Sequence, residues 1–114
     1  MIGDPQAFRY EVDSGASRTT TLRLHGELDI ASATKLAEVL HELQHGDAPE
    51  IVVDLRGLSF LDSMGLSALM EAHRVGRDGH QEVSFIAGQR SVQRVFAVTK
   101  MDERVRWVDP PESV

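Results

Sequence analysis

The chain has 114 residues, of which 41% are hydrophobic and 26% are charged, and it contains no cysteine. This length is sufficient for one domain with a single core, and the lack of cysteine excludes disulfides, cysteine-based catalysis and zinc ribbons. The net charge of −6 disfavours nonspecific binding to nucleic acid and to anionic membranes, so proteins are the expected partners.

The sequence contains no targeting or membrane-spanning pattern. Residues 1–5 have neither the basic region nor the apolar stretch of a signal peptide, and no run of about 18 apolar residues occurs. We therefore expect a cytoplasmic protein. Its single domain is expected to have its core at residues 8–108, with flexible ends at residues 1–7 and 109–114.

The first half of the chain contains two predicted strands and a helix. Apolar residues at 8–12 and 19–24 are typical of strands, and the turn-forming residues 13–17 between them predict an N-terminal hairpin. Residues 32–44 are expected to form a helix that ends near Gly46, because one stripe of this segment is occupied by Leu36, Val39, Leu40 and Leu43.

The second half of the chain alternates strands and helices. We expect a buried strand at 51–55 that ends at Arg56-Gly57, followed by a helix at 63–75, a strand at 83–87, a helix at 91–98 and a last strand around Val105 and Trp107. Two strands followed by alternating helices and strands predict an α/β fold. Its mixed sheet begins with the hairpin and continues through parallel crossovers.

Ser63 opens the helix that follows the buried strand. Phe60 and Leu61 are expected to pack against the core, and Asp62 to accept hydrogen bonds from backbone N–H groups of the first helical turn. A phosphate on Ser63 would lie beside the same N–H groups and the positive end of the helix dipole. Gly65 has no side chain, which would let another protein approach closely. Alternatively, Asp62 and Ser63 only cap the helix, and Gly65 only loosens its first turn.

Three blocks of the chain carry a resemblance to a known family. Residues 54–70 contain the run Asp-Ser-Met-Gly-Leu, residues 24–29 contain Gly-Glu-Leu-Asp, and residues 91–96 are Ser-Val-Gln-Arg-Val-Phe. In this order and spacing the blocks resemble STAS domains, the fold shared by bacterial anti-sigma factor antagonists and the cytoplasmic tails of sulfate transporters. The resemblance covers about residues 8–108.

The resemblance implies that Ser63 is a phosphorylation site. Ser63 directly follows the aspartate that corresponds to the family motif Asp-Ser-(Ser/Thr)-Gly-Leu. Met64 stands where many members carry a second Ser or Thr, so a secondary phosphoacceptor is absent from this motif.

The function implied by the resemblance is that of an anti-sigma factor antagonist. In this family the unphosphorylated protein binds an anti-sigma factor that is also a serine kinase and releases a sigma factor for transcription, and a PP2C-like phosphatase removes the phosphate. ATP and magnesium belong to the kinase, so we expect no cofactor, no metal and no enzymatic activity in this chain; a homodimer is left open. The residues expected to bind the partner are Asp29, Asp62, Ser63, Met64, Gly65, Ser67 and Ala68.

The predicted helix at 63–75 has two apolar stripes, although a surface helix needs only one. The stripe expected to face the core contains Leu66, Leu69, Met70 and His73, with His73 as a satisfied core or boundary residue. The opposite stripe contains Met64, Ala68 and Val75. It is either covered by a neighbouring helix or exposed to a partner beside Ser63.

Two other functions are left open. The first is another use of the STAS fold, as a scaffold in a stress-sensing complex or as a transporter-associated subunit without a phospho-switch. The second is a small metal-dependent hydrolase, because the run His41-Glu42-Leu43-Gln44-His45 matches the zinc-protease pattern.

The phase of the helix disfavours the hydrolase. His41 and His45 fall opposite the leucine stripe, so we expect both to point to solvent, and no third ligand is evident nearby. Asp29 and Asp62 would suit a catalytic carboxylate pair, but the family resemblance instead implies that they orient the serine and keep the rim of the site acidic. For Asp29, a role as a turn or cap residue is left open as an equal alternative.

Overall fold

The computed structural model describes residues 6–14 and 18–111, and its elements follow the predicted order. In chain order these are β1 (Arg9–Asp13), β2 (Thr19–Leu28), α1 (Ile30–Gln44), β3 (Glu50–Leu61), α2 (Ser63–Asp78), β4 (Glu82–Ile86), α3 (Arg90–Val98), the 3₁₀ helix η1 (Met101–Glu103) and β5 (Arg106–Trp107). The predicted α/β fold class is confirmed.

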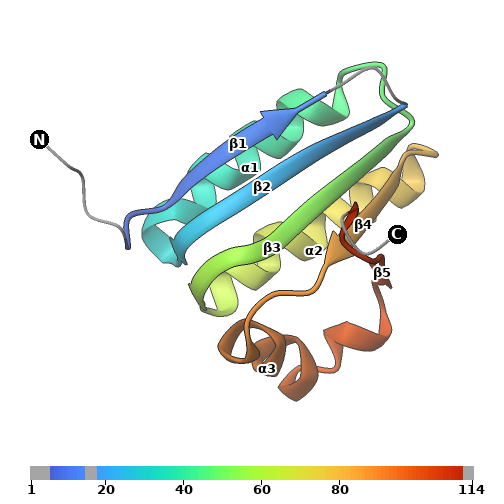
Figure 1. Cartoon of the computed structure of the whole chain (residues 1–114). Coiled ribbons are helices and arrows are strands. Elements are labelled where there is room, and N and C mark those ends of the chain that lie inside the picture. Colours follow the sequence, from blue (N-terminus) through green and yellow to red (C-terminus); the bar gives the residue numbers. More distant parts are fainter. Residues whose placement is uncertain (1–5, 15–17, 112–114) are drawn as a thin grey trace, which may run out of the picture.

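The strands form one five-stranded sheet with the order β1-β2-β3-β4-β5 (Figure 1). Strands β1 and β2 pair antiparallel, and each later pair is parallel. The predicted mixed sheet with an N-terminal hairpin is therefore confirmed. The predicted hairpin turn at 13–17 lies partly outside the described residues.

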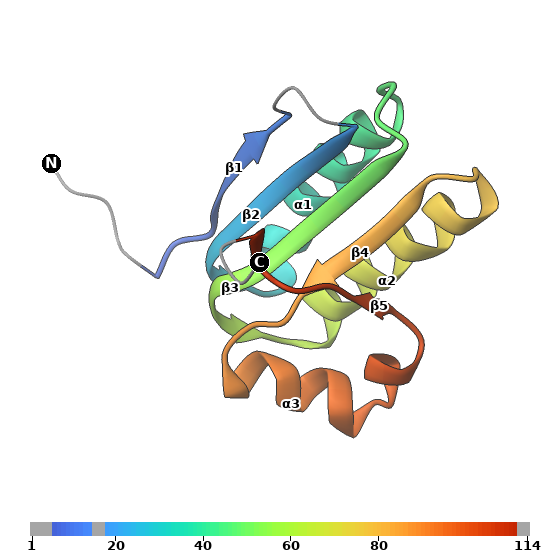
Figure 2. The same ribbon diagram turned by 45° about the vertical axis from the view of Figure 1, so that its right-hand side comes forward.

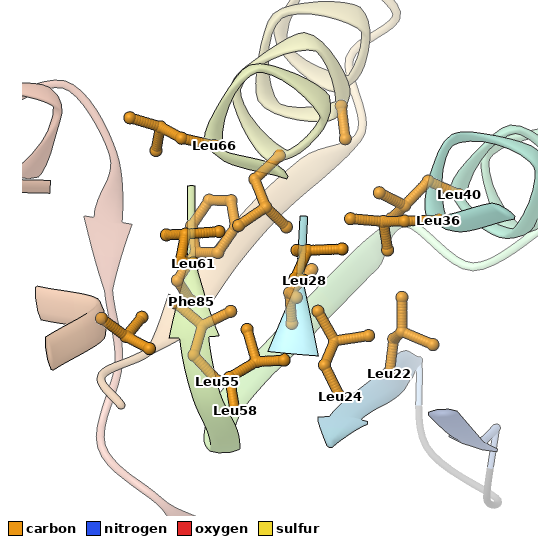
Figure 3. Close-up of a cluster of buried hydrophobic side chains, with 14 of the residues drawn as sticks. Leu22, Leu24, Leu28, Leu36, Leu40, Leu55, Leu58, Leu61, Leu66 and Phe85 are labelled. Atoms are coloured by element: carbon orange, nitrogen blue, oxygen red, sulfur yellow. The ribbon is translucent and has the colours of Figure 1, made fainter. Parts of the chain in front are cut away.

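Helices α1 and α2 pack on the same face of the sheet, and α3 lies near the carboxyl end of β3 (Figures 1 and 2). Figure 3 shows the core between the sheet and these helices. Full burial of one such leucine or phenylalanine is worth about 1.5–3 kcal/mol, so the cluster holds α1 and α2 against the sheet. Its fully buried members include Leu22, Leu24, Leu28, Leu36, Leu55, Leu58 and Phe85.

Strands β2 and β3 are both longer than the sequence predicts. β3 continues through Arg56 and Gly57, where a turn was expected. Its parallel pairing with β2 extends past this point, and two register shifts absorb the irregularity. A Cβ atom on Gly57 would lie only 2.3 Å from His25 Nδ1, so this glycine allows the two strands to approach each other instead of forming a turn.

The continuation of β3 also corrects the expectation for Phe60. Its side chain is 45% exposed, whereas Leu61 is 3% exposed and packs in the core as predicted. Successive strand residues point to opposite faces of a sheet, so only one of the two can face the helices.

Both long helices differ from the prediction at one end. α1 begins at Ile30, earlier than expected, because Asp29 caps it. α2 continues through Gly76 and has its C-cap at Gly79. Gly76 is buried against β4, where a Cβ atom would lie 2.5 Å from Val83 Cγ2, so its role is close packing and not helix termination.

The chain ends were expected to be flexible at 1–7 and 109–114, and most of these residues lie outside the described ranges. The described Gln6 is held in place: its carbonyl accepts the Glu27 N–H at 2.9 Å, and its side-chain oxygen accepts the Ser59 hydroxyl at 2.8 Å. Within residues 6–14 and 18–111, no helix has the length and apolar character needed to cross a bilayer.

Candidate interaction site

The site lies where β2 and β3 end. Because these strands are parallel, their carboxyl ends meet at one edge of the sheet, and Leu28 pairs with Leu61 as the last residue of each. The Asp62 N–H donates to the Leu28 carbonyl at 3.2 Å. One aspartate follows each strand, and a helix starts directly after it. The first turns of α1 and α2 therefore lie next to each other (Figure 1).

Asp29 caps α1. Its Oδ1 accepts the Ala31 N–H at 3.0 Å, and the Ser32 hydroxyl oxygen accepts the Asp29 N–H at 3.0 Å. This reciprocal pair is a capping box, which satisfies donors that would otherwise be free at the start of a helix. The sequence left open whether Asp29 is a turn or an interface residue, and the geometry makes it a helix cap beside the site.

Asp62 binds the first turns of both helices. Its Oδ1 accepts the Met64 N–H at 3.0 Å and the Gly65 N–H at 2.9 Å, which confirms the predicted cap of α2. Its Oδ2 accepts the Ile30 N–H of α1 at 3.1 Å. This second contact was not predicted from the sequence. One sequence signal could have indicated this contact: Leu-Asp occurs at the end of two strands, and these strands are parallel and adjacent in the sheet.

Ser63 is the first residue of α2, and it is exposed. Within the part of the chain that the structure describes, no hydrogen bond engages its hydroxyl group. The hydroxyl is therefore free of intramolecular hydrogen bonds among the described residues, on an exposed residue.

Three large apolar residues near the carboxyl ends of β2 and β3 are exposed. Ile30 is 69% exposed, Met64 is 47% exposed and Phe60 is 45% exposed. Ile30 and Met64 are the residues whose N–H groups bind Asp62, and Phe60 precedes Asp62 in β3. We call the surface formed by Ile30, Ser63 and Met64 the serine patch. Phe60 is not part of it, because its side chain points to the sheet face opposite Leu61 and the helices. Exposed apolar groups next to polar ones are typical of protein interaction surfaces.

Gly65 has a different role from the one expected. It is buried, and a Cβ atom there would lie 2.8 Å from the Leu28 carbonyl oxygen and 2.9 Å from Leu61 Cδ1. The missing side chain therefore lets α2 start close against this chain's own β2 and β3. It does not leave room for another protein.

The second apolar stripe of α2 is partly covered by α1. Gln44 Nε2 donates to the Ala72 carbonyl at 2.8 Å, and Ala72 is 4% exposed. Ala68 is half-buried on the same side, whereas Met64 and Val75 remain exposed at the two ends of the stripe. The neighbouring helix therefore covers the middle of the stripe and leaves its two ends exposed.

The histidines of the zinc-protease pattern are both exposed, as predicted, and the Leu36 and Leu40 side chains of the same helix are buried. The His45 Nδ1 lies 2.9 Å from the His41 carbonyl oxygen, which occupies one ring nitrogen. No group of three His, Cys, Asp or Glu side chains suited to a metal ion occurs among the described residues. The arrangement therefore does not offer a third ligand to these histidines.

His73 lies at a groove that the sequence does not indicate. It is half-buried, as expected for a boundary residue, and it lines the groove together with other α2 residues and Met101 of η1. Its partial burial, together with the positive charges of Arg77 and Arg104, lowers the pKa of His73 below its ordinary value.

The family of the chain follows from its sequence as a whole. A family model described as "Mlab, STAS domain" matches residues 12–108. The chain belongs to the STAS domain family. The STAS domain of this chain is also similar to an anti-sigma-B factor antagonist from Staphylococcus aureus, with 24% identity over 82 residues that cover 72% of this chain and 76% of the relative.

Solved structures confirm the fold. An anti-sigma factor antagonist from Mycobacterium paratuberculosis superimposes with a TM-score of 0.84 at 19% identity, covering 98% of this chain and 94% of the other. The unphosphorylated form of the anti-sigma factor antagonist SpoIIAA gives a TM-score of 0.72 at 24% identity, covering 94% and 90% of the two chains. The phosphorylated form of SpoIIAA from Bacillus gives a TM-score of 0.68 at 22% identity, with 94% of each chain covered.

Proposed function

We propose that this STAS domain is an anti-sigma factor antagonist, and that phosphorylation of Ser63 controls its binding to an anti-sigma factor with serine kinase activity. The observation that carries the proposal is the exposed hydroxyl group of Ser63 at the start of α2, within a patch of exposed apolar side chains. The names of the S. aureus relative and of SpoIIAA, which is known in unphosphorylated and phosphorylated forms, support it.

The serine patch supplies the contacts for the partner. Burial of Ile30 and Met64 would provide most of the affinity, because desolvation of apolar surface is favourable and both residues are at least 47% exposed here. Ser67 is exposed along α2, the next turn after Ser63, and extends the polar rim. Asp29 and Asp62 act mainly by holding the two helix starts in place, while Ala68 borders α1.

The chain is the substrate in this proposal, and the kinase is the enzyme. Ser63 Oγ forms a bond to the γ-phosphorus of ATP, the bond from that phosphorus to the bridging oxygen breaks, ADP leaves, and the hydroxyl proton passes to a base of the kinase. ATP and magnesium are held by the kinase. A PP2C-like phosphatase then hydrolyses the phosphate ester and restores the serine. These reactions would take place in the cytoplasm, where the sigma factor acts.

The phosphate would act on the interface and leave the fold intact. The N–H groups of Met64 and Gly65 are already bound to Asp62 Oδ1, so they are not available to the phosphate. The phosphate instead adds about two negative charges beside the Asp62 carboxylate. A partner that covers this surface would remove water from both anions, which is costly without a compensating cation. We infer that phosphorylation weakens binding.

The site of phosphorylation is tested by labelling. A pull-down from the native cell extract with wild-type protein and with Ser63→Asp, analysed by mass spectrometry, identifies partners that prefer the uncharged form. The kinase among them is then incubated with ATP and the purified protein. Ser63→Ala should abolish labelling, and Ser67→Ala, an exposed serine of the next turn, should retain it.

Phosphate mapped to another residue would contradict the assignment of Ser63. A different result would favour a STAS scaffold or a transporter-associated subunit that has no phospho-switch. In that result, the partners bind wild type and Ser63→Asp equally well, and none of them phosphorylates the protein.

A further inference from the structure

A groove of about 490 Å³ runs along α2, between this helix and the segment 99–104, which contains η1. This volume falls in the range of about 300–1,000 Å³ that binding clefts occupy. Ser63 and Ser67 line one end of the groove, and Arg77 and Arg104 line it farther along. The groove therefore begins beside the serine patch and extends away from it.

Part of the groove is apolar and adaptable. Leu66 of α2 is buried, and Met70, one helical turn later, is half-buried and packs against the core. Met101 of η1 contributes a second half-buried methionine from the opposite wall. Unbranched methionine side chains adjust to different partners, which suits a surface that receives side chains of another protein.

The remaining lining is positively charged, although the whole chain is acidic. Three arginines and one glutamate line the groove. Glu71 is bound by Arg74, with Arg74 Nε at 3.1 Å from Oε2, so this carboxylate is already neutralised. Arg77 reaches Asp78 only at 3.5 Å, and Arg104 forms no ion pair with any carboxylate in residues 6–14 and 18–111. The charges of Arg77 and Arg104 are therefore available to an anionic ligand.

We propose that this groove binds an acidic amphipathic helix of a partner protein. Apolar side chains on one face of that helix would contact Leu66, Met70 and Met101, and carboxylates beside this face would meet Arg77 and Arg104. The inference goes beyond the phospho-switch, because it would hold even if Ser63 were never phosphorylated.

Charge and packing argue against other occupants. Nucleic acid would meet the two arginines, but it has no apolar side chains for the methionines, and the chain carries a net charge of −6. A second copy of this chain has an acidic helix in α1, but its apolar residues Leu36 and Leu40 are already buried in the core. The matching helix therefore belongs to a different protein.

The probe for the test is a fluorescein-labelled peptide of about 18 residues, which is long enough to form a helix. It carries Leu at positions i, i+3, i+4 and i+7 and Glu on the flanking positions. One control peptide replaces each Glu by Lys, and another replaces each Leu by Ser. Binding to the full chain is followed by fluorescence anisotropy. The Glu/Leu peptide should bind at least about tenfold more tightly than either control.

Variants localise the binding. Arg77→Glu combined with Arg104→Glu should weaken binding of the Glu/Leu peptide at least about tenfold. Arg94→Glu, at an exposed arginine of α3 that does not line the groove, is the matched control and should change binding less than about twofold. In the wild-type protein, the methyl NMR signals of Met70 and Met101 should shift when the Glu/Leu peptide is added. Such shifts would show that the peptide binds in the groove.

The proposal is wrong if the Lys peptide binds as well as the Glu peptide, if Arg94→Glu weakens binding as much as the double variant, or if the two methionine signals do not move. Circular dichroism checks that the variants are folded. Should the double variant unfold, the single change Arg104→Gln takes its place, with a smaller loss of the same sign expected. None of these results depends on a kinase, so they separate this inference from the proposed phospho-switch.

Discussion

Asp62 couples the two helices that border the serine patch. Its carboxylate accepts three backbone N–H groups, two from α2 and one from α1. A change at this residue therefore affects the start of both helices, whereas an ordinary N-cap affects one. Ser63 follows Asp62 directly and is exposed.

Substitutions of Asp62 test this coupling. Asp62→Ala removes all three acceptor contacts and should lower the free energy of unfolding by about 2 kcal/mol, the upper end for a helix cap. Asp62→Asn keeps an oxygen for Met64 and Gly65, but its NH₂ group cannot accept from the Ile30 N–H, so a loss of about 1 kcal/mol is expected. Urea denaturation measures both. If the two variants were as stable as the wild type, the carboxylate would not be holding either helix.

Asp54 is the ionisable side chain most deeply placed in the sheet, at 4% exposure. Burial by itself would raise the pKa of Asp54, but the hydrogen bonds and charge of Arg56, together with the charge of Arg23, outweigh it and lower the pKa below the ordinary 3.8. Because the folded-state pKa is below the unfolded-state pKa, the carboxylate stabilises the fold above about pH 3.8. This stabilisation is lost as the pH falls through the lower, folded-state pKa.

Asp54→Asn should therefore have a pH-dependent effect. At neutral pH the variant should lose about 1.5–3 kcal/mol of unfolding free energy, since it loses charged hydrogen bonds from Arg56. The difference from wild type should become smaller as the pH is lowered below about 3.8, because the wild-type side chain then becomes neutral as well. Urea denaturation over this pH range measures the difference. A difference that stayed constant down to the lowest pH would rule out this role of the ionised carboxylate.

At the scale of the elements, periodicity predicted the centres of the strands and helices better than their ends. The leucine stripe of α1 is buried as expected, because packing and local pattern agree there. Arg56-Gly57 is typical of a turn, yet β3 continues through it, because pairing with β2 outweighs the local preference. The 3₁₀ helix η1 has no periodic signal of its own, and its position depends on contacts with α3.

The exposed ends of the second stripe of α2 allow a matched test of the partner surface. Met64→Asp places a charge in the serine patch and should weaken binding of the kinase by at least about 1 kcal/mol, while the thermal midpoint changes little, because the side chain is 47% exposed. Val75→Asp, at 39% exposure and the other end of the helix, should leave binding unchanged. Isothermal titration and thermal unfolding of both variants decide this. Loss of folding in Met64→Asp, or equal weakening by Val75→Asp, would argue against a partner at the patch.

At the scale of the molecule, the parallel sheet brings the site together. The sequence predicted Asp62, Ser63 and Met64 as site residues, since they form one continuous run before and inside a helix. It could not identify Ile30 as part of the same surface, because the contact from Ile30 to Asp62 spans 32 positions and depends on two adjacent parallel strands. The groove along α2 was missed for the same reason, since η1 reaches α2 only in the folded chain.

The central claim is that the charge on Ser63 sets the affinity for the partner, and calorimetric titration of the kinase with two matched preparations tests it most directly. One preparation is fully phosphorylated by the kinase with ATP and repurified, and the other is the same sample after phosphatase treatment. The phosphorylated protein should bind at least about tenfold more weakly. Its phosphate lies beside the Asp62 carboxylate, and binding of the partner removes water from both anions. Equal affinity of the two preparations would contradict the phospho-switch.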